Sequence, residues 1–312
     1  MTRVAAIDCG TNSIRLLVAD AKDGVLTAVS REMRIVRLGQ GVDATGSFAP
    51  EAIERTRVAL EEYAGIIRET GASAIRMVAT SATRDASNRD EFFEMTRTIL
   101  DPIVSGSVAE VITGDEEARL SFAGAVGELD AKGAPFVVVD LGGGSTELGD
   151  AKGVRAAFSA NIGCVRLTER FLHSDPPTAE EIAGAREFVR EKLHEAFEDV
   201  PIGEASSWVG VAGTMTTIAA IASGLQEYDA DKVHLTRISF TDLFEVCDRL
   251  VHMTREERAA LGPMHPGRVD VIGGGSLVCS VLAEEFERRG AVSTLVVSEH
   301  DILDGIAMSI KV

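Results

Sequence analysis

Short apolar runs alternate with longer amphipathic stretches along the whole chain, which is the pattern of a mixed α/β protein. The clearest helix pattern covers 50–70, where apolar positions include Ile53, Leu60 and Ile67. Pro50 stands at a favoured helix start and Gly71 at a favoured helix stop. This segment therefore predicts a helix with defined ends.

The first half of the chain shows a strand-rich beginning followed by alternating helices and strands. We expect its strands at 3–8, 14–20, 25–38, 74–78 and 108–112, and its helices at 50–70, 88–100 and 115–126. The pattern restarts at 136–139. From there we expect a strand pair, a helix at 178–198, a strand-turn-helix unit at 207–223, a helix at 241–252, a second strand-turn-helix unit at 269–289, a strand at 295–297 and a short helix from 301.

Two such halves predict a duplicated α/β fold with a cleft between two domains, 1–127 and 128–312. The last helix packs either within the second domain or back on the first.

Each half opens on a glycine-and-hydroxyl turn between two apolar runs. The turns are Asp8-Cys9-Gly10-Thr11-Asn12-Ser13 and Asp140-Leu141-Gly142-Gly143-Gly144-Ser145-Thr146-Glu147. Glycine lets the backbone approach an anion, and consecutive N–H groups with Ser and Thr hydroxyls can surround phosphate oxygens. The leading aspartate suits Mg²⁺ or a bridging water. The two turns therefore predict two matching phosphate clamps.

Composition places the chain among ordinary globular proteins, because 312 residues with 45% hydrophobic content can build two cores. The start lacks the pattern of a signal peptide, and no apolar stretch is long enough to span a bilayer, which predicts a cytoplasmic protein without a membrane role. Four cysteines lie far apart, which favours reduced core thiols over a disulfide frame or a zinc site.

The acidic excess limits the class of partner. A formal net charge of −18 argues against nucleic-acid binding, because such a surface repels phosphate backbones. It does not exclude a small anionic substrate, since a metal ion, turn amides and a few arginines can reverse the potential inside a cleft.

Five motifs in order resemble the Ppx/GppA family of exopolyphosphatases and guanosine pentaphosphate phosphohydrolases. They are Asp8 to Ser13, Ala79-Thr80-Ser81-Ala82-Thr83-Arg84, Gly114-Asp115-Glu116-Glu117-Ala118-Arg119, Asp140 to Glu147, and Val211-Ala212-Gly213-Thr214. The resemblance runs from residue 3 to about residue 310 and implies the duplicated actin-like (ribonuclease H-like) fold. It is to a short, two-domain member, without the C-terminal helical domains of longer ones.

The resemblance gives Glu117 the role of general base on the attacking water. The alternative is that Asp115, Glu116 and Glu117 only complement a helix dipole. Arg84, which we expect in a strand-to-loop segment, is similar to the arginine that grips the terminal phosphate; a lone arginine is more often a surface residue.

The resemblance also implies that Asp140 and Glu147 hold Mg²⁺, with Mn²⁺ as a substitute, and that Asp8 occupies the equivalent place in the first half. Glu147 could instead be a cross-strand surface charge. The proposed phosphate donors share small or hydroxyl side chains or backbone amides at the turns: Thr11, Asn12, Ser13, Gly142, Gly143, Gly144, Ser145 and Thr146.

Two further glycine sites each precede a predicted helix whose free N–H groups attract anions: Gly213-Thr214 and Gly273-Gly274-Gly275-Ser276. The resemblance assigns Gly213 and Thr214 to phosphate binding and places Arg268 near the anion path. This corner could hold a purine nucleotide, a second phosphate of a long chain, or nothing, and Gly273 to Gly275 could only permit tight strand-helix packing.

The function favoured by these features is Mg²⁺-dependent release of orthophosphate from the end of inorganic polyphosphate. The rivals are the same hydrolysis of pppGpp, a phosphotransferase in which polyphosphate or ATP donates to ADP or a small acceptor, and a non-catalytic sensor of ppGpp. A sensor needs no water-activating carboxylate, so the presence of Glu117, Asp140 and Glu147 argues against it. The resemblance further implies a homodimer.

Overall fold

The computed structural model describes residues 2–22, 25–142, 145–150, 153–290 and 292–311, without the side chains of 145–150. The chain divides into two compact units, Met1–Gly124 with Ile302–Val312, and Ala125–Asp301. The C-terminal segment therefore belongs to the first unit, and the chain passes between the units twice. In the described part of the chain, no helix is both long and apolar enough to cross a membrane.

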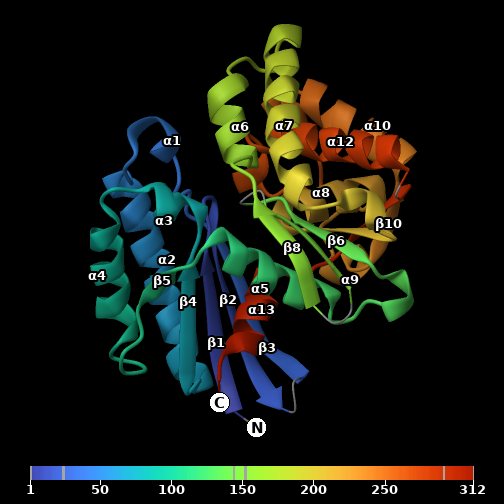
Figure 1. The fold of residues 1–312 in the computed structure, drawn as a ribbon. Helices are drawn as coiled ribbons and strands as arrows, with labels where there is room; N and C mark the ends of the chain where they lie inside the picture. The colour runs from blue at the N-terminus through green and yellow to red at the C-terminus, as the bar shows by residue number, and fades with distance from the viewer. Residues whose placement is uncertain (1, 23–24, 143–144, 151–152, 291, 312) are drawn as a thin grey trace. The chain divides into compact units, whose positions relative to one another are not determined.

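The first unit contains one sheet of five strands in the order β3-β2-β1-β4-β5 (Figure 1). Its strands are β1 (Thr2–Cys9), β2 (Ser13–Lys22), β3 (Val25–Ile35), β4 (Ala74–Ala79) and β5 (Ala109–Val111). Its helices are α1 (Val42–Thr45), α2 (Pro50–Thr70), α3 (Ser81–Asp85), α4 (Arg89–Leu100), α5 (Gly114–Val126, whose last two residues fall in the second unit) and α13 (Ile302–Ser309).

Alternating residues of β1 supply two cores on opposite faces of this sheet. Ala5 and Ile7 pack with residues of α2 and α4, whereas Val4 and Ala6 pack with residues of α5 and α13. This is the period-2 alternation of a strand buried on both faces. The helix α13, drawn in red in Figure 1, therefore completes the core of a sheet whose first strand is at the other end of the chain.

The second unit contains a sheet of six strands in the order β10-β11-β9-β6-β7-β8. Its strands are β6 (Phe136–Asp140), β7 (Ser145–Asp150), β8 (Gly153–Ser159), β9 (Ser207–Val211), β10 (Thr236–Ser239) and β11 (Thr294–Val297). Its helices are α6 (Cys164–Phe171), α7 (Ala179–Asp199), α8 (Ala212–Ala222), α9 (Ala230–Val233), α10 (Phe240–His252), α11 (Arg255–Ala259) and α12 (Ile272–Arg289), with the 3₁₀ turns η1 (Ala131–Gly133), η2 (Ile202–Glu204) and η3 (Pro266–Arg268).

The two sheets share one topology. In the first, β1 pairs antiparallel with β2 and parallel with β4. In the second, β6 pairs antiparallel with β7 and parallel with β9. Extending outward, β8-β7-β6-β9-β11 repeats the order and directions of β3-β2-β1-β4-β5, and β10 adds an antiparallel edge. The predicted duplication of an α/β half is therefore confirmed.

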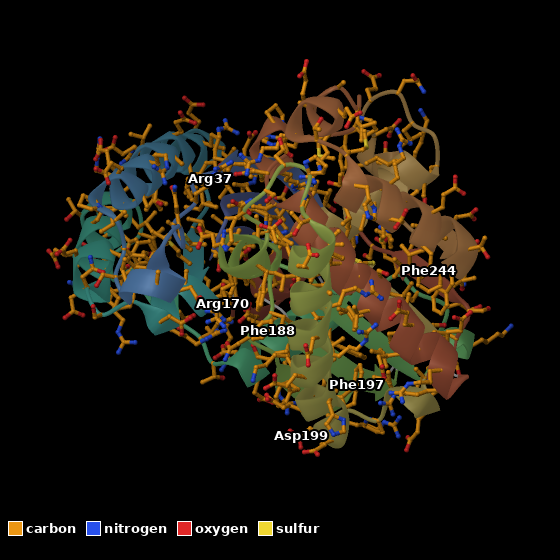
Figure 2. All side chains as sticks on the ribbon, turned by 90° about the horizontal axis from the view of Figure 1, so that it is seen from above. Arg37, Arg170, Phe188, Phe197, Asp199 and Phe244 are labelled. Carbon is orange, nitrogen blue, oxygen red and sulfur yellow. The ribbon has the colours of Figure 1, made fainter. Side chains whose placement is uncertain are left out.

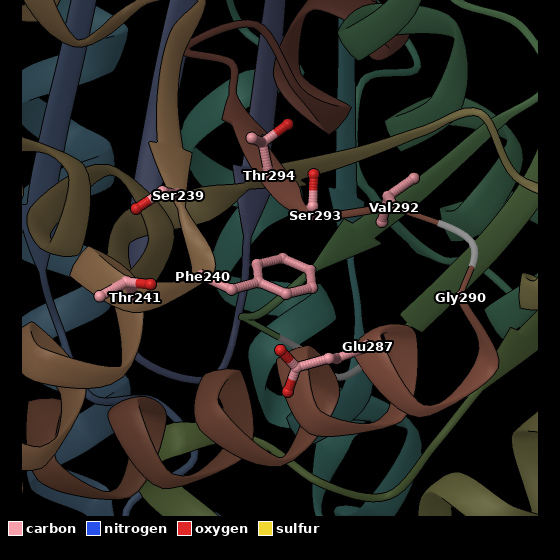
Figure 3. Close-up of a pocket in the computed structure, with 8 residues that line it drawn as sticks. All are labelled: Ser239, Phe240, Thr241, Glu287, Gly290, Val292, Ser293 and Thr294. Carbon is pink, nitrogen blue, oxygen red and sulfur yellow. The ribbon is translucent and has the colours of Figure 1, made fainter.

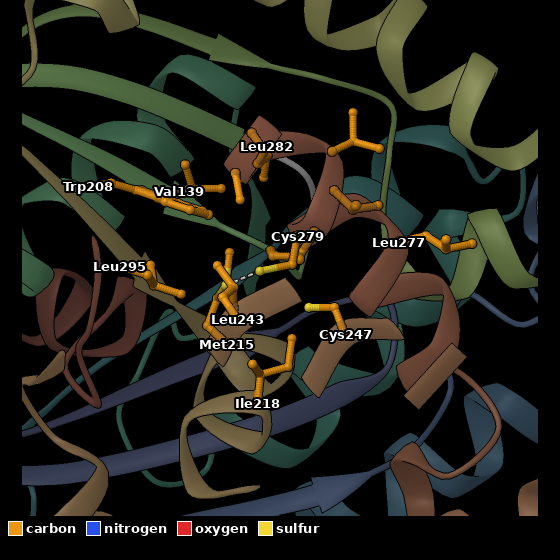
Figure 4. Packing of buried hydrophobic residues seen from close by; sticks show 14 of the residues in the cluster. Val139, Trp208, Met215, Ile218, Leu243, Cys247, Leu277, Cys279, Leu282 and Leu295 are labelled. Atoms are coloured by element: carbon orange, nitrogen blue, oxygen red, sulfur yellow. Dashed lines mark hydrogen bonds between the residues drawn. The ribbon is translucent and has the colours of Figure 1, made fainter. Parts of the chain in front are cut away.

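The second unit has its own core under the helices α8, α10 and α12 (Figure 4). Trp208 of β9 stacks on Phe286 of α12, with ring centroids 4.7 Å apart. At the surface of this unit, Arg170 of α6 lies over the ring of Phe188 of α7, 5.4 Å from its centroid (Figure 2). The first contact holds α12 to the sheet, and the second joins α6 to α7.

Helix α2 has the bounds that the sequence predicts, because Pro50 begins it and Gly71 ends it in the left-handed conformation at φ 72°. Other predictions were wrong. The segment after β4 is helix α3 and not a loop, helix α6 was not predicted, and no strand precedes α12 in the described part of the chain between 269 and 271. Burial against neighbouring elements decides these short segments, and periodicity does not encode it.

Candidate active site

The first glycine turn connects β1 and β2 and is fixed by a buried ion pair. Asp8 is only 5% exposed, and its Oδ2 accepts hydrogen bonds from Arg15 Nη2 at 2.7 Å and Nε at 3.0 Å. The two residues face each other across the β1-β2 ladder. Arg15 therefore balances the charge of a carboxylate that the strand pattern alone would leave in the core.

The turn itself is locked by the segment that follows β3. The N–H of Gly39 donates to Thr11 O at 2.8 Å, and the N–H of Arg37 donates to Asn12 O at 2.9 Å. A Cβ on Gly39 would lie 2.3 Å from Thr11 Cγ2, so a larger residue there would force the Thr11 side chain to move. The carbonyl groups of Thr11 and Asn12 are thus fixed by hydrogen bonds from the segment after β3. The predicted donors Thr11, Asn12 and Ser13 are all partly exposed.

Glu117 and Arg84, both predicted as site residues, form an ion pair inside the first unit. Arg84 Nη1 lies 2.8 Å from Glu117 Oε2 and also donates to Ile112 O at 3.0 Å. Glu117 is 4% exposed, whereas a quarter of the Arg84 side chain is accessible. Within the described part of the chain, both side-chain hydrogen bonds of Arg84 use Nη1.

The three acidic residues in the first turn of α5 have three different environments. Asp115 pairs with Arg119 at the surface, and Glu116 pairs with Arg76 with 45% of its side chain exposed. Only Glu117 is buried. A favourable helix dipole explains acidic residues at this position but not the burial of one of them. The structure therefore separates Glu117 from its two neighbours.

The second glycine turn follows β6 in the second unit. Asp140 is 6% exposed, and its Oδ1 accepts the N–H of Gly142 at 3.1 Å. A Cβ on Gly163 would lie 2.8 Å from Gly142 O, so this turn, like the first, is backed by a glycine. Gly143 and Gly144 lie outside the described residues. Ser145, Thr146 and Glu147 lie in β7, but their side chains are outside the description.

The two buried aspartates differ as candidates for Mg²⁺. A carboxylate at the end of a strand offers the oxygen ligands that Mg²⁺ prefers, and Asp140 fits this role. Asp8 fits it less well as a direct ligand, because Arg15 already balances its charge. Nothing in the sequence pattern distinguished the two, since Arg15 lies in the next strand.

A third glycine site lies where β9 meets α8. Ala212 has φ 72°, a strained conformation for a residue with a Cβ. The Arg268 guanidinium lies against Gly213, where a Cβ would be 2.4 Å from Arg268 Cζ. Arg268 Nη1 also donates to Thr217 Oγ1 at 3.1 Å. The structure thus brings Gly213 and Arg268 together at the first turn of a helix, next to Thr214, which is 5% exposed.

We predicted that the glycines at 273–275 precede a helix, and this prediction was wrong. They lie inside the first turns of α12, where a Cβ on Gly274 would lie 2.8 Å from Cys164 O and one on Gly275 2.7 Å from Thr214 Oγ1. The glycines let α12 approach α6 and α8 closely. The sequence left open whether these glycines bind an anion or permit tight packing. The contacts support tight packing, of helix against helix and not of strand against helix.

A separate hollow of about 580 Å³ lies at the outer end of the second sheet, between β10, β11 and the end of α12 (Figure 3). Its lining includes Phe240 and Glu287 and none of the predicted site residues. We assign it no part in the chemistry.

Comparison with known protein families identifies the family of this chain. A model of the Ppx/GppA phosphatase family matches residues 17–309. The chain belongs to the Ppx/GppA phosphatase family. This Ppx/GppA chain is 62% identical over 316 aligned positions to "Exopolyphosphatase 2" of Mycobacterium tuberculosis, and the alignment covers 99% of both chains.

Two solved structures show the same fold. A Ppx/GppA enzyme of Aquifex aeolicus superposes with a TM-score of 0.80 at 34% identity, covering 99% of both chains. An exopolyphosphatase of Cytophaga hutchinsonii superposes with a TM-score of 0.86 at 25% identity, covering 97% of this chain and 96% of the other. The predicted duplicated α/β fold and the family assignment are confirmed.

Proposed function

We propose that this chain is an exopolyphosphatase that hydrolyses the terminal phosphoanhydride of inorganic polyphosphate and releases orthophosphate. The family assignment and the 62% identical exopolyphosphatase support this activity. The observation that carries it on the molecule itself is the pair of Arg84 with buried Glu117, which joins an anion-binding edge to a carboxylate.

In this proposal, Glu117 accepts a proton from the attacking water. Arg84 binds the terminal phosphate through Nε and Nη2, a fork that matches two phosphate oxygens, while Nη1 keeps Glu117 in position. Thr11, Asn12 and Ser13 donate to further phosphate oxygens from a turn held rigid by Gly39. Gly142 to Thr146 act in the same way in the second unit.

We propose Mg²⁺ as the cofactor, with Mn²⁺ as a substitute, held by Asp140 and Glu147. When bound, the ion neutralises charge on the phosphate oxygens. Asp8, at the equivalent place in the first unit, is proposed to act toward a metal ion through a bound water, because Arg15 already occupies its carboxylate. Gly213, Thr214 and Arg268 are proposed to bind a more distant phosphate of the chain or of a nucleotide.

The test is orthophosphate release by the purified chain with Mg²⁺, on short polyphosphate, long polyphosphate and pppGpp, with and without chelator. Activity on polyphosphate that chelator and Glu117→Gln both abolish supports the proposal. Activity on pppGpp alone makes the nucleotide hydrolase correct. Formation of ATP from polyphosphate and ADP, in place of free phosphate, establishes a phosphotransferase.

We further propose that the chain acts in the cytoplasm as a homodimer. Light scattering of the purified protein measures the oligomeric state, and a monomer at micromolar concentration contradicts it.

A further inference from the structure

One carboxylate and two imidazoles of the second unit, none of them a predicted site residue, converge on one point. One ligand atom from each of Glu128, His234 and His300 lies within 4.8 Å of the other two. Glu128 Oε2 is 3.0 Å from His234 Nε2, and Glu128 Oε1 is 3.7 Å from His300 Nδ1. We name these residues the Glu-His-His cluster. Elsewhere in the described ranges, no other group of three His, Cys, Asp or Glu residues is this close.

The cluster joins three segments that are far apart in sequence. Glu128 follows α5, His234 caps the C-terminus of α9, and His300 follows β11. The two imidazole ring centroids are 4.7 Å apart. The side chain of His234 is 20% exposed and that of His300 35%, whereas that of Glu128 is 58% exposed. The imidazoles are thus held by packing while the open side faces solvent, so an ion can enter.

We propose that the Glu-His-His cluster binds a divalent transition-metal ion, of which Zn²⁺ fits best. Two imidazole nitrogens and one carboxylate are a ligand set that Zn²⁺ takes with a fourth position open to water. Ligand atoms about 2.1 Å from a tetrahedral ion lie about 3.4 Å apart. Glu128 Oε2 lies 3.0 Å from His234 Nε2, slightly less than this value, and the three ligand atoms lie within 4.8 Å of one another, so small side-chain movements bring them to this spacing. Mg²⁺ prefers oxygen ligands, so the cluster differs in kind from the proposed site at Asp140.

A backbone hydrogen bond to His234 provides a way to detect metal binding. The N–H of Glu299 donates to His234 Nδ1 at 3.2 Å, so in the metal-free state the ring proton is on Nε2 and faces Glu128. Binding at Nε2 moves that proton to Nδ1, and Glu299 N–H loses its acceptor. The hydrogen bond from Glu299 and the hydrogen bond between His234 Nε2 and Glu128 are both given up for bonds to the ion, and the backbone at Glu299 changes environment.

The position of the cluster gives the ion a structural effect. The chain enters the second unit at Ala125 and leaves it at Asp301. Glu128 and His300 lie close to these two points, and a shared ion would join both connecting segments to each other and to α9. We expect Zn²⁺ to stabilise the second unit against unfolding at the two points where the chain enters and leaves it.

The experiment measures Zn²⁺ binding to the purified full chain after chelation, by equilibrium dialysis with Mg²⁺ in large excess to occupy oxygen-ligand sites. His234→Ala and His300→Ala remove ligands. His252→Ala is the matched control, because this exposed imidazole pairs with Asp248 on α10 outside the cluster. We expect one Zn²⁺ per chain in wild type and His252→Ala, and at least a tenfold weaker affinity in the other two.

Three readouts accompany the dialysis. Cobalt substitution gives visible absorption typical of a tetrahedral site in wild type and His252→Ala only, the melting temperature of wild type rises with Zn²⁺, and the Glu299 amide changes its exchange rate. Equal affinity in all four proteins, or no bound Zn²⁺ in wild type, overturns the proposal. If an alanine variant is unfolded without metal, Glu128→Gln provides the same comparison at an exposed side chain.

Discussion

Arg84 Nη1 and Glu117 Oε2 are 2.8 Å apart, although 33 residues separate them in the chain. Arg84 comes from the short helix α3 after β4, and Glu117 from the first turn of α5 after β5. The two strands are parallel neighbours, so their carboxyl ends bring both side chains to one edge of the sheet. The same edge carries the end of β1 and the first glycine turn.

Glu117→Gln keeps the shape of the side chain but removes its charge. We expect kcat to fall by about 10²- to 10⁴-fold, as for loss of a general base, with KM changed little. Glu116→Gln is the control, because this neighbour on the same helical turn pairs with Arg76 at the surface. Steady-state phosphate release from polyphosphate measures both. If the Glu117→Gln enzyme keeps more than about a tenth of wild-type kcat, Glu117 is not the general base.

Arg84→Lys retains a positive charge but loses the planar fork. We expect kcat/KM to fall by about 10- to 100-fold, mainly through KM, because a lysine cannot bind two phosphate oxygens and Glu117 together. Arg97→Lys on α4 is the control, since this arginine forms an exposed pair with Glu94. Equal kcat/KM values for the two variants would show that Arg84 only supports the fold.

Much of the fold could be predicted from the sequence because local signals agree with tertiary packing. Pro50 and Gly71 mark the ends of α2, and the restart of the strand pattern near Asp140 reveals the duplication. The glycines 273–275 misled the analysis. Their meaning depends on the Cys164 carbonyl and on Thr214, both distant in sequence, and periodicity carries no information on such neighbours.

The candidate site was predicted in its acidic and basic members but not in the residues that hold them. Arg15, which neutralises Asp8, and Thr217, which accepts from Arg268, were missed. Gly39 was missed as well, although the pair Gly39 and Gly41 marks a turn. Ion pairs across a ladder follow from register, and register was assigned only in the structure. The roles themselves stay predictions.

Two glycine substitutions should have opposite effects on stability. A Cβ on Gly305 of α13 would lie 2.0 Å from Leu120 O, so Gly305→Ala must move the helix and should cost about 1–3 kcal/mol. A Cβ on Gly65 of α2 would have no other atom within 4 Å, and Gly65→Ala should raise the free energy of unfolding by about 0.5–1 kcal/mol. Urea unfolding followed by circular dichroism measures both. A neutral Gly305→Ala would show that α13 does not pack closely on α5.

The four cysteines should be unreactive in the folded protein, because all are buried. Burial raises the pKa of the Cys9 and Cys164 thiols. In the unfolded chain Cys9 and Cys164 lose their protons near pH ~8.5, whereas in the folded protein they keep them. The thiols therefore make no pH-dependent contribution below that pH, and stability falls as pH rises above it.

A thiol reagent at pH 8 tests whether the four cysteines are unreactive, and we expect all four to react only after denaturation. Unfolding free energies at pH 7.5 and 9.5 check the second. We expect Cys9→Ala to reduce the loss of stability by up to about 1.4 kcal/mol per pH unit. Rapid reaction of the native thiols, or an unchanged pH slope in Cys9→Ala, contradicts the burial of these groups in solution.

The return of α13 to the first unit orders events during synthesis. Residues 302–309 leave the ribosome after the whole of 125–301, so the sheet that is translated first has one face without its last helix until the second unit has emerged. Val4, Ala6 and Leu17 stay partly uncovered during that interval. The unit at the N-terminus is therefore the last to be finished, and a newly made chain exposes apolar sheet surface for as long as translation of the second unit takes.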